Sequence, residues 1–193
     1  MARPKSFDQD TVLDQAVQLF WERGYDGTSL ADLEAHLRLG RQSLYNTFGD
    51  KQTLFLKALE RYRSQVAERT CAELNAPGAG LDAIHAFFTA SVEALTAPGQ
   101  RRACLMANTI LERGSQDPGA LLRCNNVRSG LERAFRRALA QAKASGELPE
   151  GLDVEATATL LVIQTYGLSV LAKSGASAGE LNAAVEALFE GLR

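Results

Sequence analysis

The sequence contains few of the side chains from which catalytic and metal-binding sites are usually built. Only two of its 193 residues are histidines, His36 and His85, and neither stands at a recognisable motif spacing from a serine or cysteine. The three cysteines are Cys71, Cys104 and Cys124, an odd number without paired spacing, which argues against a disulfide framework and a structural zinc site. No glycine-rich phosphate loop is present. We therefore expect no enzyme activity, no cofactor and no bound metal.

An excess of charge of one sign is also missing. The net charge is −2, and the first fifty residues contain enough aspartate and glutamate to offset their arginine and lysine. Domains that bind nucleic acid over a broad surface are usually strongly basic. Any phosphate-binding surface in this chain must therefore be a local patch.

Long apolar runs are absent as well. The most apolar stretch, residues 160–163, is far shorter than the roughly 20 residues that span a bilayer. Arg3 and Lys5 near the N-terminus are not followed by an apolar run, so no signal peptide is visible. We expect a cytoplasmic protein without membrane contact.

What the sequence does contain is helical periodicity, and no stretch shows the alternation of a strand. Turn residues, most clearly Asn-Ala-Pro-Gly-Ala-Gly at 75–80, divide the periodic segments. The predicted helices span residues 8–23, 28–36, 41–48, 51–74, 81–95, 101–112, 119–145, 153–173 and 178–191. The predicted fold class is all-α with about nine helices.

Residues 28–36 have the pattern of a short amphipathic helix. Thr28 is a good N-cap, because its hydroxyl can accept a hydrogen bond from an unpaired amide of the first turn. Leu30, Leu33 and Leu37 then fall on one face at helical spacing.

Residues 41–48 form a second short helix after the link at 38–40. Leu44 and Phe48 make an apolar pair one turn apart. The other face carries hydrogen-bonding groups that can enter a groove and read base edges: Arg41, Gln42, Ser43, Tyr45, Asn46 and Thr47. Two short helices joined by a tight turn, the second one polar and outward, predict a helix-turn-helix whose second helix lies in the major groove.

These residues also resemble a known family. T-S-L-x-D-L from Thr28 and L-x-R-x-S-L-Y-x-x-F-x-x-K from Leu39, preceded by the segment 16–29, resemble the DNA-binding region of the tetracycline-repressor (TetR) family over roughly the first sixty residues. The resemblance implies a DNA-binding domain at 1–50 and a ligand-binding and dimerisation domain at 51–193. It implies a repressor that binds a palindromic double-stranded operator as a homodimer and is released by a small-molecule or electrophile inducer.

Two positions of the turn depart from the family pattern. Arg38 stands where the family usually has glycine, and Gly40 stands where it usually has a serine or threonine cap. A non-glycine residue in a left-handed conformation costs about 1 kcal/mol. Glycine at an N-cap costs only a few tenths of a kcal/mol relative to serine. The departures therefore bear on the local geometry of the turn.

The resemblance and the pattern together select the residues expected at DNA. Thr28, Tyr45 and Lys51 are expected at phosphates, Lys51 because it opens a helix that Asp50 can cap, although it also fits a solvated surface lysine. Base edges are assigned to the outward face of the second helix. The full predicted set is Thr28, Arg41, Gln42, Ser43, Tyr45, Asn46, Thr47 and Lys51. The basic residues at 3–5 form either an arm for the minor groove or a disordered tail.

The last two predicted helices, 153–173 and 178–191, carry more apolar surface than a monomer core of this size covers. In the resembling family the last two helices pair with their copies in a four-helix bundle. We therefore expect a homodimer; burial within one chain is the alternative.

Between these ends, the candidate ligand-binding residues are Phe88, Cys104, Asn108 and Tyr166. Simple core packing is the alternative for each of them. The segment from Cys104 to Asn108 resembles a Cys-x-x-x-Asn segment in a branch of the family that includes regulators of reactive electrophiles. Arg101 and Arg102 would favour the thiolate of Cys104, whereas a buried inert thiol is the alternative.

Two other functions remain open from the sequence. Within DNA binding, the chain fits an activator or a nucleoid-type protein without a ligand. Outside it, the chain fits a small-molecule or redox-sensing helical module with little or no DNA binding. For a regulator, the predicted helix 51–74 is long enough to carry a ligand signal to the DNA-binding domain.

Overall fold

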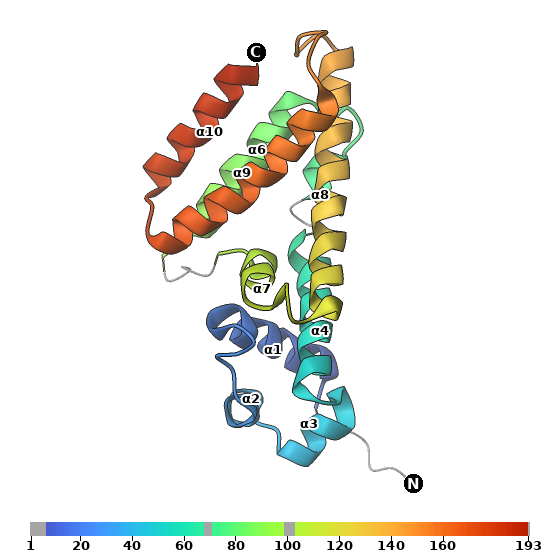
Figure 1. The fold of residues 1–193 in the computed structure, drawn as a ribbon, viewed down its shortest axis with the longest axis vertical. Helices are drawn as coiled ribbons and strands as arrows, with labels where there is room; N and C mark the ends of the chain where they lie inside the picture. The colour runs from blue at the N-terminus through green and yellow to red at the C-terminus, as the bar shows by residue number, and fades with distance from the viewer. Residues whose placement is uncertain (1–6, 68–70, 99–102, 193) are drawn as a thin grey trace.

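The computed structural model describes residues 7–67, 71–98 and 103–192, and every regular element in these ranges is helical (Figure 1). The N-terminal helices are α1 (Gln9–Arg23), α2 (Leu30–Leu37), α3 (Arg41–Phe48) and α4 (Lys51–Tyr62). The others are α6 (Leu81–Thr96), α7 (Leu105–Arg113), α8 (Pro118–Ala144), α9 (Val154–Ser174) and α10 (Ala178–Leu192). The predicted all-α fold with an N-terminal helix-turn-helix is confirmed.

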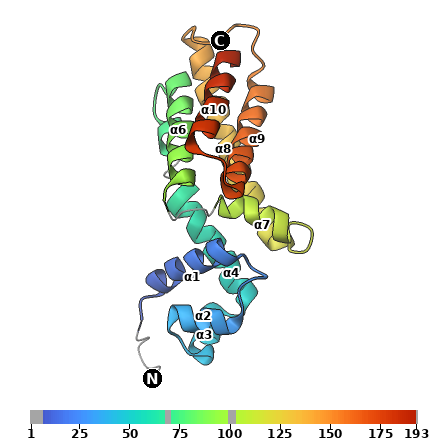
Figure 2. The same ribbon diagram turned by 90° about the vertical axis from the view of Figure 1, so that its left-hand side faces the viewer.

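The helices form an elongated molecule with two ends of different character (Figure 1). Helices α2 and α3 lie at one end, and α6, α8, α9 and α10 form a bundle at the other (Figures 1 and 2). Helix α1 lies across α4, and α7 lies between the two ends, below α9. Helices α4 and α7 occupy this middle region together with the first turns of α8, so these three helices connect the two ends.

Aspartate side chains begin several of these helices. Asp8 accepts hydrogen bonds from the amides of Asp10 and Thr11, and Asp50 accepts one from Thr53 N at 2.7 Å. Asp117 and Asp153 cap α8 and α9 in the same way. Each cap satisfies amides that have no carbonyl partner inside the helix, so these starts are encoded locally.

The predicted helix 51–74 is not one regular α-helix. Helix α4 ends at Tyr62, a π-helical turn follows at Arg63–Ala67, and a 3-10 turn occupies Glu73–Asn75; residues 68–70 lie outside the described ranges. At the break, Ser64 Oγ donates to the carbonyl of Arg61 at 2.9 Å, a side-chain bond of the kind that competes with regular helix hydrogen bonds. Helix α4 is therefore shorter than the predicted helix.

The start of the predicted helix 101–112 is also corrected. Helix α7 begins at Leu105, with Cys104 at its N-cap and Ala103 before it at φ 50°; residues 101 and 102 lie outside the described ranges. The carbonyl of Ala103 accepts a 2.6 Å hydrogen bond from Trp21 Nε1 of α1. A carbonyl held by α1 and a left-handed Ala103 keep this segment out of the helix.

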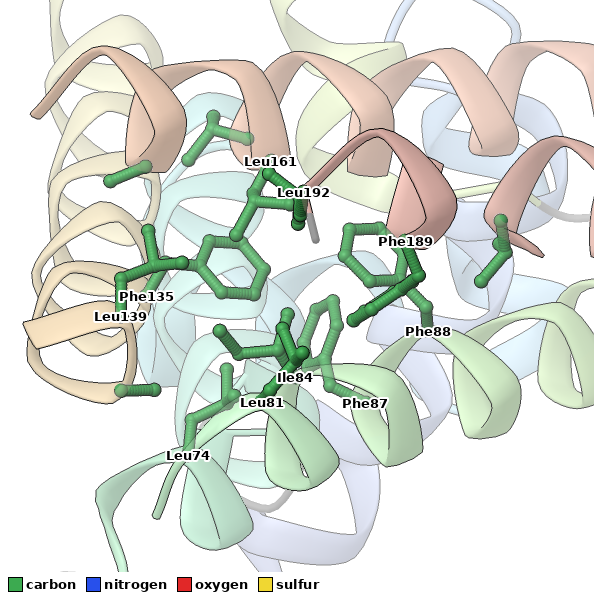
Figure 3. Close-up of a cluster of buried hydrophobic side chains, with 14 of the residues drawn as sticks. Leu74, Leu81, Ile84, Phe87, Phe88, Phe135, Leu139, Leu161, Phe189 and Leu192 are labelled. Atoms are coloured by element: carbon green, nitrogen blue, oxygen red, sulfur yellow. The ribbon is translucent and has the colours of Figure 1, made fainter. Parts of the chain in front are cut away.

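Two hydrophobic clusters hold the molecule together. The N-terminal cluster joins α1–α4 and also takes in Leu105 and Met106 of α7 and Cys124 of α8. The C-terminal cluster joins α6, α8, α9 and α10 (Figure 3). The N-terminal cluster thus extends across residue 50, where the sequence analysis placed the domain boundary.

Helix α9 is long and apolar enough, by length and composition, to cross a membrane, with a mean hydropathy of 1.4 over its most apolar window. A core helix of a globular protein passes the same test, and α9 packs against α6 and α8. On its opposite side, large apolar side chains are exposed: Leu160, Ile163, Val170 and Leu171. We call these four residues the α9 stripe.

Phe88, a predicted ligand residue, lies fully buried in the C-terminal cluster (Figure 3). Its ring stacks on Phe135 at 5.8 Å between centroids and meets Phe87 edge-on at 5.3 Å. Phe88 is therefore a core residue in this conformation, as the packing alternative stated.

We expect Phe88→Ala to lower the free energy of unfolding by about 3–5 kcal/mol, because it removes a fully packed ring and leaves a cavity. Urea unfolding followed by circular dichroism measures this. Phe88→Leu, which keeps most of the volume, should cost less. A loss below about 1 kcal/mol for the alanine variant would contradict the core role, since such a loss is typical of sites outside the core.

Candidate nucleic-acid interface

Ser29 is the N-cap of α2, and this corrects the predicted cap at Thr28. Ser29 Oγ accepts from Asp32 N at 3.1 Å, while Asp32 Oδ2 accepts from Ser29 N at 2.9 Å, which completes a capping box. Thr28 turns inward, and its hydroxyl donates to the carbonyl of Gly24 at 2.6 Å. Thr28 is fully buried, so its side chain does not lie on a DNA-facing surface.

The turn between α2 and α3 accommodates both departures from the family pattern. Arg38 adopts the left-handed conformation (φ 54°, ψ 38°) in which glycine is usual, and its amide bonds the carbonyl of Glu34. Gly40 is the N-cap of α3 and provides no side-chain cap. The turn is therefore closed, at the cost of about 1 kcal/mol for the strained arginine.

Helix α3 has one buried and one exposed face. Leu44 and Phe48 are buried in the N-terminal cluster. The residues on the opposite face are exposed, apart from Thr47, which is half-buried; this recognition face consists of Arg41, Gln42, Ser43, Tyr45, Asn46 and Thr47. Because α3 lies at the tip of the molecule (Figure 1), nothing in the described chain obstructs its approach to a groove.

Two amides of the recognition face are already paired. Gln42 Nε2 donates to Asn46 Oδ1 at 2.9 Å, one helical turn away. The pair leaves the Gln42 oxygen and the Asn46 amino group as one acceptor and one donor. Side-chain amides of this kind read adenine through its N6 and N7 atoms in the major groove.

Lys51 rests on an aromatic ring. Its Nζ lies 4.1 Å from the ring centroid of Tyr25, a cation–π geometry. Burial lowers the pKa of Lys51, and the carboxylates of Asp26 and Glu112 oppose that shift. Lys51 is therefore neither a freely solvated lysine nor fully buried; its charge is held at the start of α4, two residues after Gly49 ends the recognition helix.

The turn between α1 and α2 is tied to α7. Both oxygens of Glu112 accept hydrogen bonds from it, Oε2 from Tyr25 N at 3.0 Å and Oε1 from Asp26 N at 2.7 Å. Arg113 pairs with Asp26 at 3.2 Å and lies 4.6 Å from the centroid of the Tyr25 ring. We call Gly24, Tyr25, Asp26, Glu112 and Arg113 the α7 junction. None of these five residues was among the predicted site residues.

The predicted ligand residues other than Phe88 lie around α7. Cys104 is half-buried and receives a hydrogen bond from the Tyr62 hydroxyl at 3.8 Å. Burial, with a smaller contribution from nearby Cys104, raises the pKa of both Tyr62 and Tyr166. Asn108 Oδ1 accepts from Lys173 Nζ of α9 at 3.0 Å. Cys104 and Tyr166 are thus brought close to each other, with Tyr62 beside them.

At the tip of the molecule, a compact turn is followed by a second helix that has one buried and one exposed face. This arrangement is that of a helix-turn-helix DNA-binding protein. Two family models support this class. Residues 12–58 match the bacterial regulatory proteins of the tetR family, and residues 80–188 match the tetracyclin repressor-like C-terminal domain. The chain belongs to the TetR family of bacterial transcriptional regulators.

Relatives and solved structures agree over nearly the full length. The chain is 39% identical to the HTH-type transcriptional regulator YezE of Bacillus subtilis, covering 90% of each chain. It is 35% identical to the transcriptional repressor ComR of Escherichia coli, covering 93% of this chain and 86% of ComR. A cysteine mutant of the TetR-family regulator CifR, solved with a 26-base-pair operator, superposes with a TM-score of 0.85 at 30% identity, covering 99% of this chain and 100% of that one.

We expect Lys51→Ala to weaken binding to all DNA sequences about equally and to reduce the slope of log affinity against log salt by about 1 for each subunit, because a phosphate contact is lost. A salt titration by fluorescence anisotropy measures both. Gln42→Ala is the matched contrast, since it should change sequence preference and leave the slope intact. An unchanged affinity and slope for Lys51→Ala would rule out the phosphate contact.

Proposed function

We propose that this protein is a dimeric transcriptional repressor that places α3 of each subunit in the major groove of a palindromic operator and leaves the DNA when an inducer binds. The exposed recognition face on a closed helix-turn-helix carries this proposal. The relatives support it, since ComR is a repressor and CifR is solved on operator DNA. Such a repressor acts in the cytoplasm, where the chromosome is.

Within this proposal, residues 1–50 form the DNA-binding domain, and residues 51–193 bind the inducer and the second subunit, with Lys51 at their start adding a contact to DNA. Arg41, Gln42 and Asn46 read bases, Tyr45 and Lys51 contact phosphates, and Ser43 and Thr47 complete the contact face. Their exposure on α3, and the position of Lys51 at the start of α4, support these roles. Thr28 has no part in the contact, because it is buried.

The α9 stripe supports a dimer. Its four residues recur at helical spacing along one side of α9, and Ile163 is 62% exposed. Gly167, between them, has no neighbouring atom within 4 Å of a Cβ position, so a second helix can approach closely there. A second copy of α9 and α10 would cover this apolar surface and set two recognition helices at a fixed spacing, as a palindrome requires.

We expect wild-type protein to select inverted repeats from a randomised DNA library, because two-fold related recognition helices read matching half-sites. Ile163→Glu should give a monomer in analytical ultracentrifugation, since it places a charge in the apolar interface. The monomer should bind the selected duplex at least about 100-fold more weakly, because the gain from two linked sites is lost.

Leu122→Glu is the matched control for this change. Leu122 is also a large exposed apolar residue, 59% exposed, but it belongs to α8 and lies outside the α9 stripe. This variant should remain dimeric and bind DNA as the wild type does. A dimeric Ile163→Glu variant would overturn the interface, and the absence of any enriched repeat would overturn the proposed function in favour of a sensing module without DNA binding.

For the inducer, Cys104 with Asn108 and Tyr166 is the proposed contact region, and Cys104 is the proposed target of an electrophile. Cys104 is partly accessible at the start of α7, next to Tyr62. Burial disfavours the thiolate form of the other two cysteines. Burial raises the pKa of Cys71, and it raises the pKa of Cys124 to about 12, so little thiolate is present on either at neutral pH.

We therefore expect Cys104 to be alkylated by iodoacetamide faster than Cys71 and Cys124 at pH 7, because the thiolate is the reacting form. Mass spectrometry of digests taken over time gives the three rates. The Cys104→Ser variant shows how much of the total reaction belongs to this residue. If Cys104 reacts no faster than the other two, the electrophile role is dropped and Cys104 is a packing residue.

A further inference from the structure

The carboxylate of Glu112 makes two hydrogen bonds to a distant part of the chain. Both of its oxygens accept hydrogen bonds from consecutive backbone amides, Tyr25 N and Asp26 N, which lie 87 and 86 residues earlier in the chain. These amides belong to the turn that follows α1 and precedes α2. Hydrogen bonds to an ionised acceptor are roughly twice as strong as neutral ones. Two of them on adjacent amides fix both the position and the direction of the turn.

The turn is shaped to receive this carboxylate. Gly24 ends α1 at φ 74°, and a Cβ built there would lie 2.7 Å from Glu112 Oε2, closer than real contacts allow. Glycine therefore provides the left-handed conformation and the space for the carboxylate at the same position. Arg113, the next residue, adds the ion pair with Asp26 and lies over the Tyr25 ring, on which Lys51 also rests.

Helix α7 also contacts the C-terminal bundle of α6, α8, α9 and α10, which we call the effector end of the molecule. It has only nine residues, Leu105–Arg113, so its two ends move together. Asn108, one turn before Glu112, accepts the hydrogen bond from Lys173 of α9. A displacement of α9 or of the residues around Cys104 therefore acts on the same short helix that holds the α1–α2 turn.

The alternative route through α4 is less direct. Helix α4 packs on α8 of the bundle, but it gives way to the π-helical turn at Arg63–Ala67, and such turns are a common cause of kinks in helices. A kinked helix transmits a movement less directly than a straight one, whereas α7 is unbroken between its two contacts.

We propose that Glu112 is a positioning residue for operator binding, through which α7 sets the orientation of the helix-turn-helix. The proposal rests on the proposed function and adds to it the residue that joins the effector end to the DNA-binding end. Glu112 itself does not touch DNA. It acts through the amides of Tyr25 and Asp26, and through them on α2 and α3.

A positioning residue and a phosphate contact differ in their salt dependence. Loss of a phosphate contact lowers the salt slope, because fewer counterions are released. Loss of a positioning contact lowers affinity at every salt concentration and leaves the slope unchanged. Loss of a contact needed only for stability instead lowers the unfolding midpoint and speeds amide exchange throughout α1.

The first part of the test uses wild-type protein alone. Hydrogen exchange read by NMR should show the amides of Tyr25 and Asp26 protected, although they lie outside the helices. Glu112→Gln is then compared with Glu150→Gln, which removes the same charge from an exposed site in the loop before α9. The DNA probe is the inverted-repeat duplex that the wild type selects from a randomised library.

The expected result for Glu112→Gln is binding weaker by about tenfold, within the usual range of coupling between sites. A glutamine has one acceptor oxygen for two amides, so exchange at Tyr25 and Asp26 should speed up. The salt slope, the unfolding midpoint and exchange inside α1 should match those of the wild type and of Glu150→Gln.

Three results overturn the proposal. Unprotected Tyr25 and Asp26 amides in the wild type would show that the contact does not persist in solution. Wild-type affinity in Glu112→Gln would show that the contact does not position the recognition helix. A lower unfolding midpoint with faster exchange throughout α1 would assign Glu112 to stability. Failure of the wild type to select any duplex would instead overturn the proposed function, and this inference with it.

Discussion

The packing of α1 across α4 is the constraint on which the DNA-binding end depends. Phe20 meets Phe55 edge-on at 5.0 Å, and Trp21 meets Tyr62 in the same way at 5.0 Å, so aromatic rings join the two helices along their length. Because α4 starts two residues after Gly49 ends α3, its direction largely sets that of the recognition helix. Apolar burial thus assembles the domain, and short polar contacts then fix its orientation.

Much of this architecture could be predicted because its signals are local. Leu33, Leu37, Leu44 and Phe48 repeat at helical spacing and are all buried, and Asp50 caps α4 as its position in the sequence indicates. These features need only neighbours within a turn or two. The same holds for the recognition face, since a short helix with two buried residues must expose the remainder.

The predictions that failed depended on partners outside the predicted helix. Thr28 and Ser29 are adjacent hydroxyl residues and both are acceptable caps; the carbonyl of Gly24 takes Thr28 and leaves Ser29 for α2. The start of α7 is set by Trp21 from α1. The carboxylate of Glu112 binds backbone amides, which any residue except proline provides, so no side-chain pattern in the sequence marks its partners.

The two links in the middle of the molecule have different mechanical consequences. A domain joined to the bundle only where α4 packs on α8 could still rock about that single contact and present α3 at several angles. A second attachment at the α7 junction removes that freedom, because two separated contacts define an orientation where one does not. In a dimer formed through α9, the spacing of the two recognition helices then depends on both attachments. Under the proposed role of Glu112, a change in α7 within each subunit therefore alters the fit to a rigid palindrome without any change in the dimer interface.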